Sequence, residues 1–183
     1  MKISRIFLMY FASILLLSSN ANGRDLTHIN TALNSVKLQG SGRLNWWGFH
    51  LYDAFFYRAS NPSSSEFALD VRYQKSFKGI SIANSSAEEM KKIGVPETQA
   101  NLWGKELAAI LPNIEPGDSL TAIYLPKQGT VFYYDGKPIG QIPGTEFSKA
   151  FFGIWLDSKT SVPKLRTELL GQGCPPPLFN EAC

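Results

Sequence analysis

The sequence predicts an α+β domain in which a largely antiparallel sheet is covered on one face by helices. Three observations support this fold class. The elements follow the order strands, helices, strands, helices, and short turns join most consecutive strands, which favours antiparallel pairing. The helical segments carry apolar stripes that need a surface to cover. At 183 residues, with 44% hydrophobic and 13% aromatic residues, the chain is large enough for one compact domain.

The first 21 residues have the layout of a secretory signal peptide. Lys2 and Arg5 form a basic start, residues 6–17 are an apolar run, and Ser19-Asn20-Ala21 places small residues before a cleavage point. We expect cleavage after Ala21 and a periplasmic or secreted protein. An uncleaved membrane anchor is the alternative. The apolar run is short for a bilayer, so we expect no stable membrane span after signal removal.

The mature chain is nearly neutral. Lys2 and Arg5 account for two of the 18 basic residues, and 15 residues are acidic, so residues 22–183 carry a net charge of only +1. This balance gives no support for nucleic acid as a partner. The sequence contains no HExxH, GxSxG, P-loop or dinucleotide GxGxxG motif, and we expect neither a metal nor a cofactor.

The stretch from Gly40 to Tyr57 is the most informative part of the chain. It predicts two strands joined at Trp46, Trp47 and Gly48, with apolar residues on both faces. Both faces therefore need apolar neighbours, such as helices on one side and a second surface or a ligand on the other. The Gly40-Ser41-Gly42 sequence before Arg43 favours a bend or a close backbone approach over a nucleotide loop.

Arg43 is the candidate site residue in this stretch. Its guanidinium is charged at any ordinary pH, so burial among apolar walls would require an anionic or hydrogen-bonding partner. The alternative is a surface arginine paired with an acid. The nearby aromatic residues either form core or line a cavity for an elongated or aromatic ligand; they are Trp46, Trp47, Phe49, Tyr52, Phe55, Phe56 and Tyr57. His28 and His50 have no evident carboxylate partner, and we interpret His50 as a packed or edge histidine.

The other elements follow from local patterns. Residues 22–35 are polar and predict a loose lead-in, whereas alternation predicts a strand at 67–73. Ser85 and Ser86 each precede a Glu by three residues, a capping-box pattern that predicts a short helix ending at Ile93. The remaining predictions are a helix from Pro96 to Leu111, a strand at 120–125, a hairpin of 130–134 and 137–142 around Asp135-Gly136, and helices at about 145–155 and 163–170.

The two cysteines lie in the tail, at residues 172–183. Cys174 and Cys183 form an even pair in a chain that we expect to be exported, which favours a disulfide. Their spacing does not fit a CxxC redox pair, and no histidine lies nearby for a metal site. We therefore predict a structural bridge that closes a small loop in the tail.

Several segments together resemble the chalcone isomerase-like family, and most closely its exported bacterial branch. They are the strand from Gly40 to Arg43, the Trp103 helix followed by Pro112 and Gly117-Asp118, the Phe132-Tyr133-Tyr134 hairpin with Gly140, and the block FSKAFFGIWLDSKTSVPKLRTELLG. The last block is the most specific. The resemblance covers residues 36–171, nearly all of the mature chain.

The resemblance implies an open-faced β-sandwich, in which a long curved sheet is backed by helices with a ligand cleft between them. Some members are isomerases that close a chalcone's phenolate onto its enone, and others are non-catalytic relatives, some of which bind fatty acids. Arg43 matches the strand arginine of the isomerases. Tyr52 stands where they have a threonine, and Gly153 where they have a small hydroxyl residue, so only the arginine carries over.

Three functions remain open from the sequence. In the first, the protein is non-catalytic and binds a small apolar or aromatic carboxylate, such as a fatty acid, with Arg43 and Tyr52 as hydrogen-bond donors to the carboxylate. In the second, it is an intramolecular lyase in which Arg43 stabilises the developing enolate. In the third, it is an envelope protein with no small-molecule ligand. Binding predicts a cavity ending at Arg43, and the third function predicts a paired Arg43 and no cavity.

Overall fold

A computed structural model describes residues 25–179 of the chain. Its centre is a six-stranded sheet in which the strands lie in sequence order, and every neighbouring pair is antiparallel. The strands are β1 (Val36–Trp46), β2 (Phe49–Ala59), β3 (Phe67–Tyr73), β4 (Ser119–Leu125), β5 (Gly129–Tyr134) and β6 (Lys137–Ile142). The predicted α+β class and antiparallel sheet are confirmed.

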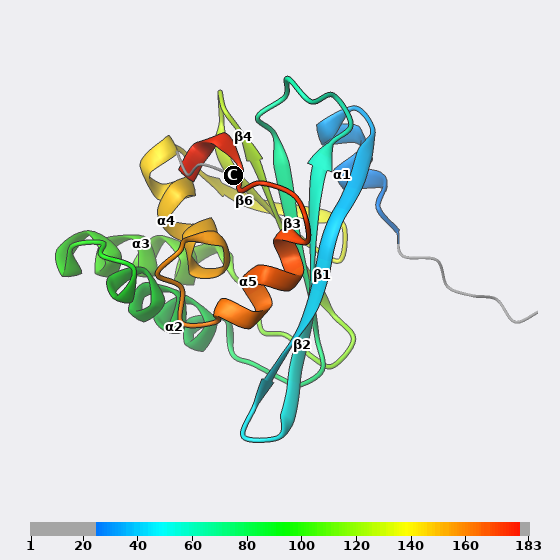
Figure 1. The fold of residues 1–183 in the computed structure, drawn as a ribbon. Coiled ribbons are helices and arrows are strands. Elements are labelled where there is room, and N and C mark those ends of the chain that lie inside the picture. The colour runs from blue at the N-terminus through cyan, green and yellow to red at the C-terminus, as the bar shows by residue number, and fades with distance from the viewer. Residues whose placement is uncertain (1–24, 180–183) are drawn as a thin grey trace, which may run out of the picture.

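Helices cover one face of this sheet (Figure 1). They are α2 (Gly79–Lys92), α3 (Glu97–Ile110), α4 (Thr145–Leu156) and α5 (Pro163–Leu170), and a short 3₁₀ turn, η1 (Pro177–Phe179), follows. Asp135 and Gly136, which join β5 to β6, have φ values of 45° and 74°. These positive values fit the predicted type I′ turn.

The helix α1 (Thr27–Leu33) lies on the opposite face of the sheet (Figure 1). A loose lead-in was expected here. Instead Ile29 and Leu33 are 0% and 2% exposed and form a second, smaller core with Tyr57, Ala68 and Ile123. The helix is too short to be stable alone, so the tertiary contacts of its two apolar residues hold it in place.

The start of α2 also differs from the prediction. The helix begins at Gly79, so Ser85 and Ser86 lie inside it, and the Ser86 hydroxyl donates to the Ile82 carbonyl at 2.9 Å. The backbone N–H of Gly79 donates instead to Asn113 Oδ1 at 3.1 Å. The chain caps this helix from a distant segment, which a local capping pattern does not reveal.

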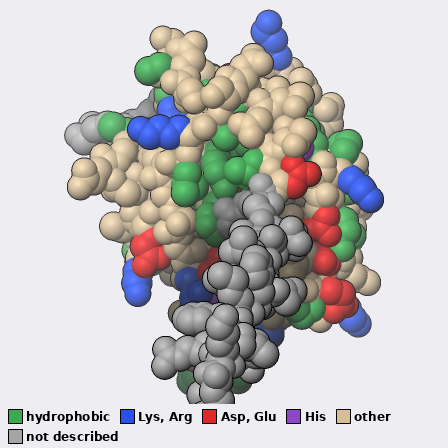
Figure 2. Space-filling view, turned by 90° about the vertical axis from the view of Figure 1, so that its right-hand side faces the viewer, with side chains coloured by type: hydrophobic (Ala, Val, Ile, Leu, Met, Phe, Trp, Pro, Cys, Tyr) green, Lys and Arg blue, Asp and Glu red, His purple; other side chains and the backbone are tan. Residues whose placement is uncertain are grey.

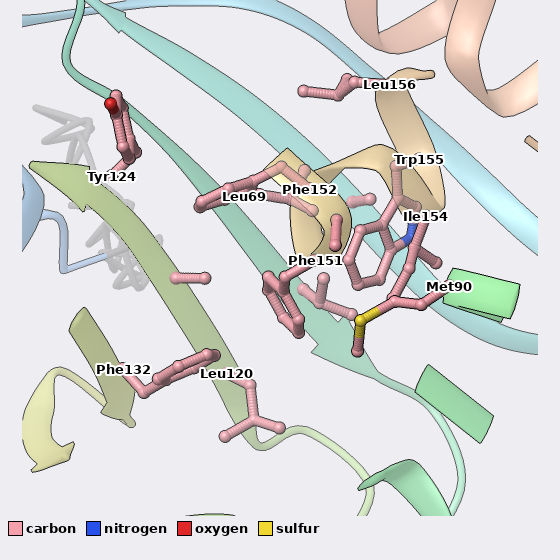
Figure 3. Close-up of a cluster of buried hydrophobic side chains, with 14 of the residues drawn as sticks. Leu69, Met90, Leu120, Tyr124, Phe132, Phe151, Phe152, Ile154, Trp155 and Leu156 are labelled. Carbon is pink, nitrogen blue, oxygen red and sulfur yellow. The ribbon is translucent and has the colours of Figure 1, made fainter. Parts of the chain in front are cut away.

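The main core lies between the sheet and α4 (Figure 3). Aromatic rings from both layers meet edge to face: the ring centroids of Phe67 and Phe152 are 4.7 Å apart, and those of Phe132 and Phe151 are 5.1 Å apart. Such pairs stabilise a core beyond the area that they bury. The inward-facing side chains of the strands and the apolar face of α4 thus pack together in one core layer.

The close approach predicted at Gly40 is present. A Cβ atom at this position would lie 2.2 Å from the Glu168 carbonyl oxygen and 2.4 Å from that of Leu169. The backbone of α5 therefore rests directly on β1, and only glycine leaves room for it.

The hairpin of β1 and β2 extends beyond the sheet. β3 ends at Tyr73, which pairs with Tyr52, so the turn between the two longer strands projects past the other elements (Figure 1). Trp47 and Gly48 have φ values of 50° and 81°, which form the predicted bend.

Two predictions concern segments outside the described range. The signal peptide at residues 1–21 lies before it, and Cys183 lies after it, so cleavage and the Cys174–Cys183 bridge stay predictions. Between residues 25 and 179 the structure contains no helix with the length and apolar character that crossing a membrane would require.

Candidate ligand-binding cavity

A cavity of about 540 Å³ opens between the inner face of the sheet and the helices α2 and α4. Its size lies in the range of small-molecule sites. Most of its wall is apolar: the strands contribute Leu44, Leu69, Val71 and Phe132, and α4 contributes Phe151 and Ile154. Figure 3 shows several of these side chains pointing toward one another from the sheet and from α4.

Polar groups gather at one part of this wall. The Trp155 indole N–H of α4 donates to the Tyr52 hydroxyl of β2 at 2.9 Å. On α2, Lys92 Nζ lies 2.7 Å from Glu89 Oε1, and the Ser161 hydroxyl donates to the other Glu89 carboxylate oxygen. All five residues line the cavity. The site thus combines long apolar walls with a few polar groups that can fix the orientation of a ligand.

Tyr52 is a neutral hydrogen-bond donor in this site. Burial raises the pKa of its hydroxyl to about 12; the hydrogen bond from Trp155 opposes the rise, and the negative charge of Glu89 adds to it. Burial likewise raises the pKa of Tyr73, whose ring lies 5.7 Å from that of Tyr52. Within residues 25–179 the Tyr52 hydroxyl hydrogen has no acceptor, so it is available to a ligand oxygen.

The structure does not bring Arg43 to the cavity. Arg43 pairs with Asp53 across the β1–β2 ladder, and the next pair, Leu44 and Tyr52, lines the cavity. Since successive side chains of a strand point to opposite faces, Arg43 and Asp53 lie on the other face of the sheet. The Arg43 side chain is 58% exposed, and its Nε donates to Asp53 Oδ1 at 3.1 Å. We had expected a cavity that ends at Arg43, and the structure does not show one.

Asp53 is also the hydrogen-bond partner of His50. The His50 Nε2 atom lies 3.1 Å from Asp53 Oδ1, and the Gln74 amide donates to Asp53 Oδ2 at 3.3 Å. His50, interpreted from the sequence as a packed or edge histidine, therefore has a carboxylate partner three residues away. Arg43, His50 and Gln74 together surround the Asp53 carboxylate on the outer side of the hairpin.

His28 takes part in a second polar cluster on the face covered by α1. Its Nε2 atom lies 3.0 Å from the Thr121 hydroxyl, which donates to the buried Asp70 at 2.9 Å. Burial lowers the pKa of His28, and the charges of Asp70 and Asp25 partly oppose this. Figure 2 views this face and shows hydrophobic side chains at its centre with charged ones toward its edges.

The predicted aromatic cluster is divided among four environments. Phe56 is fully buried in the main core, Tyr57 packs under α1, and Tyr52 lines the cavity. Trp47 and Phe49 are 86% and 60% exposed at the hairpin tip. Sequence reasoning missed Glu89, Lys92, Ser161 and Trp155 as cavity residues. Glu89 and Lys92 had only the helical i, i+3 spacing as a signal.

The cavity has no evident means of holding a metal. No group of three or more His, Cys, Asp or Glu side chains comes together anywhere in residues 25–179. The arrangement can hold a mostly apolar molecule, donate a hydrogen bond from Tyr52 to its polar end, and place the Lys92 ammonium nearby.

The fold and the cavity define a class of protein: an antiparallel sheet backed by helices, with a mostly apolar cavity between the layers. A family model described as chalcone isomerase-like matches residues 25–171. The chain therefore belongs to the chalcone isomerase-like family.

Two similar proteins extend this assignment. An uncharacterized protein of Haemophilus influenzae is 28% identical over 136 residues, which cover 73% of this chain and 67% of that protein. The crystal structure of the Arabidopsis thaliana fatty-acid binding protein AtFAP1 matches with a TM-score of 0.58 and 11% identity, over 75% of this chain and 87% of the plant chain. At this identity the second match shows a shared fold.

Proposed function

We propose that this protein is a non-catalytic carrier that binds a small apolar carboxylate, such as a fatty acid, in the cavity between sheet and helices. The observation that carries the proposal is the combination of an apolar cavity of about 540 Å³ with the Tyr52 hydroxyl and Lys92 at its polar part. The fatty-acid binding protein of the same fold supports it.

The walls suit an acyl chain. Each methylene buried against Leu69, Val71, Phe132 or Ile154 contributes roughly 0.8 kcal/mol, so a long chain gains most of its affinity from the cavity itself. An apolar tail also matches a cavity whose wall is mostly apolar and carries a few polar groups.

Tyr52 and Lys92 are the proposed partners of the carboxylate. The neutral Tyr52 hydroxyl donates to one oxygen, and the Lys92 ammonium supplies the charge. Lys92 is already 2.7 Å from Glu89, and its side chain is 58% exposed, so a ligand carboxylate competes with Glu89 for a flexible cation. Through this competition, Glu89 lowers the affinity of the cavity for acids.

The geometry favours binding over ring closure of a chalcone. The isomerase alternative needs the Arg43 guanidinium at the reacting oxygen to stabilise the enolate. Arg43 pairs with Asp53 on the opposite face of the sheet, whereas Tyr52 inside the cavity is a weak acid that stays neutral. Arg43, which matches the isomerase arginine, is not among the residues that line the cavity.

We further propose that the carrier acts outside the cytoplasm. The support is the order of basic start, apolar run and small residues at positions 2–21. Amino-terminal sequencing of the protein from an exporting host tests this step, since a chain that starts at Met1 in the cytoplasmic fraction contradicts it.

Native mass spectrometry tests the binding proposal. The mature protein is purified from an exporting bacterial host and then denatured, and the released small molecules are identified. We expect one fatty or aryl acid per chain, and its loss in the Tyr52→Phe/Lys92→Met variant. A protein that carries nothing and takes up no added fatty acid contradicts the proposal.

A further inference from the structure

The tip of the β1–β2 hairpin exposes large apolar side chains. Trp46, Trp47 and Phe49 are 64%, 86% and 60% exposed. They lie beyond the end of β3 because the last β2–β3 pair is Tyr52 with Tyr73. Figure 1 shows the tip reaching past every other element. Three exposed aromatic residues thus gather at a projecting turn, and such exposed apolar surface usually marks an interaction site.

The stability of the hairpin does not explain this choice of residues. Trp47 has φ 50°, in the left-handed region, where a bulky side chain costs about 1–3 kcal/mol. Asn or Asp suits that position of a type I′ turn far better. At Trp47 the chain therefore accepts both backbone strain and exposure of an indole to water. Strain of this kind is usually kept at functional positions.

Lysines accompany the aromatic tip. Lys75 Nζ lies 5.9 Å from the centre of the Phe49 ring, and Lys78, three residues later, is also exposed. The loop that carries them is held beside the hairpin, since the Gln74 N–H donates to the Leu51 carbonyl at 2.8 Å. Aromatic rings next to lysine ammonium groups match the boundary between acyl chains and anionic headgroups, where tryptophan is enriched.

The tip is continuous with the cavity. Trp46 is exposed and also lines the cavity, together with Leu51 of the same hairpin. Trp46 therefore belongs both to the exposed tip and to the cavity wall. A projecting turn with exposed aromatic side chains suits a deformable lipid surface.

We propose that the β1–β2 hairpin tip docks on a phospholipid bilayer and passes the apolar ligand between the bilayer and the cavity. This inference rests on the proposed carrier function. Trp47 and Phe49 enter the interface, Lys75 and Lys78 contact anionic headgroups, and Trp46 joins the bilayer to the cavity. Docking is reversible because a few side chains anchor it.

The test uses the mature chain with vesicles of phosphatidylethanolamine and a minority of phosphatidylglycerol. Vesicle flotation measures docking, and stopped-flow transfer of a fluorescent fatty acid from the vesicles measures loading. Titration with the same fatty acid below its micellar concentration measures the affinity of the cavity alone. The test variant is Trp47→Asn/Phe49→Thr, which suits the turn and leaves Trp46 in place. The control is Leu102→Ser, which removes a 50% exposed apolar side chain from α3.

We expect the test variant to float at least about tenfold less, because it lacks the two exposed aromatic side chains that would be buried in the bilayer interface. Transfer from vesicles should slow by a similar factor and no longer rise with vesicle concentration. The solution affinity should be unchanged in both variants, and Leu102→Ser should dock like the wild type. Lys75→Gln should weaken docking on anionic vesicles about fivefold and on phosphatidylcholine hardly at all.

Two results would overturn the inference: a wild-type protein that does not float, or a tip variant that floats and loads as fast as the wild type. Failure of the carrier function is recognised separately. In that case the protein binds no fatty acid in solution, while flotation still reports on the tip.

Discussion

Replacing Tyr52 by Phe should remove two roles of one hydroxyl group: accepting a hydrogen bond from Trp155 and donating one to the ligand. In the protein the Tyr52 oxygen accepts the Trp155 indole N–H at 2.9 Å, and Trp155 is only 9% exposed. Without this acceptor a largely buried donor is left unsatisfied, which costs about 1–3 kcal/mol of unfolding free energy. For a domain of this size, each kcal/mol lowers the melting temperature by about 2–4 °C.

Urea denaturation of Tyr52→Phe measures this loss, and Tyr73→Phe is the matched control. The Tyr73 ring lines the same cavity, but its hydroxyl has no hydrogen-bond partner in the described part of the chain. We expect Tyr73→Phe to change the free energy of unfolding by less than about 0.5 kcal/mol. In a double-mutant cycle with Trp155→Phe, the coupling energy should exceed about 0.5 kcal/mol.

The same substitution should weaken ligand binding. A hydrogen bond to a charged group contributes about 1.5–3 kcal/mol, so the affinity of Tyr52→Phe for a fatty acid should fall about 10- to 150-fold. The loss should be smaller for the fatty alcohol of equal length, because its hydroxyl is uncharged. Equal stability of Tyr52→Phe and Tyr73→Phe, together with an unchanged affinity for the acid, would refute the role given to Tyr52.

Three further changes test other parts of the structure. Glu89→Gln removes a negative charge beside Tyr52 and frees Lys92, so fatty acids should bind about 2- to 5-fold tighter, while fatty alcohols should bind as before. Calorimetric titration measures both affinities. Weaker binding of the acid would show that its carboxylate lies elsewhere. Gly40→Ala should cost more than about 3 kcal/mol, because its Cβ would overlap the backbone of α5; a urea midpoint near that of the wild type would contradict the close packing of α5 on β1. Because burial lowers the pKa of His28 from 6.5, the unfolded chain binds a proton more readily. The stability due to neutral His28 is therefore complete above about pH 6.5 and is lost as the pH falls below it. His28→Gln should flatten the dependence of the urea midpoint between about pH 7 and about pH 5, and an unchanged slope would contradict this origin.

Local patterns were sufficient for most of the fold. Alternation placed β3, the Asp135-Gly136 turn placed the β5–β6 hairpin, and the apolar stripe placed α4. In each case the signal lies within a few neighbouring residues. The failures are elements whose stability comes from distant contacts. α1 depends on Ile29 and Leu33 reaching the back of the sheet, and the first turn of α2 depends on Asn113.

The site was predicted less well for a related reason. Tyr52, which the family resemblance put forward as a ligand-binding residue, lines the cavity, and its role toward a ligand stays a prediction. Arg43 was expected in the cavity, but the face of a strand residue depends on its register with the neighbouring strand. The pairing of Arg43 with Asp53 fixes that face. Glu89, Ser161 and Trp155 come from segments far apart in the chain, so no sequence spacing connects them.

The most direct test of the account is a titration of the delipidated mature protein with a long-chain fatty acid, compared with a variant whose cavity is filled. Ala122 lies on β4 inside the cavity, and Ala122→Phe occupies that space at a cost of about 1–3 kcal/mol, which urea denaturation checks. Ala109→Phe adds the same ring on the exposed side of α3. The account predicts one binding site in the wild type and in Ala109→Phe, and loss of binding in a folded Ala122→Phe. Equal binding by all three proteins, or none by the wild type, would contradict it.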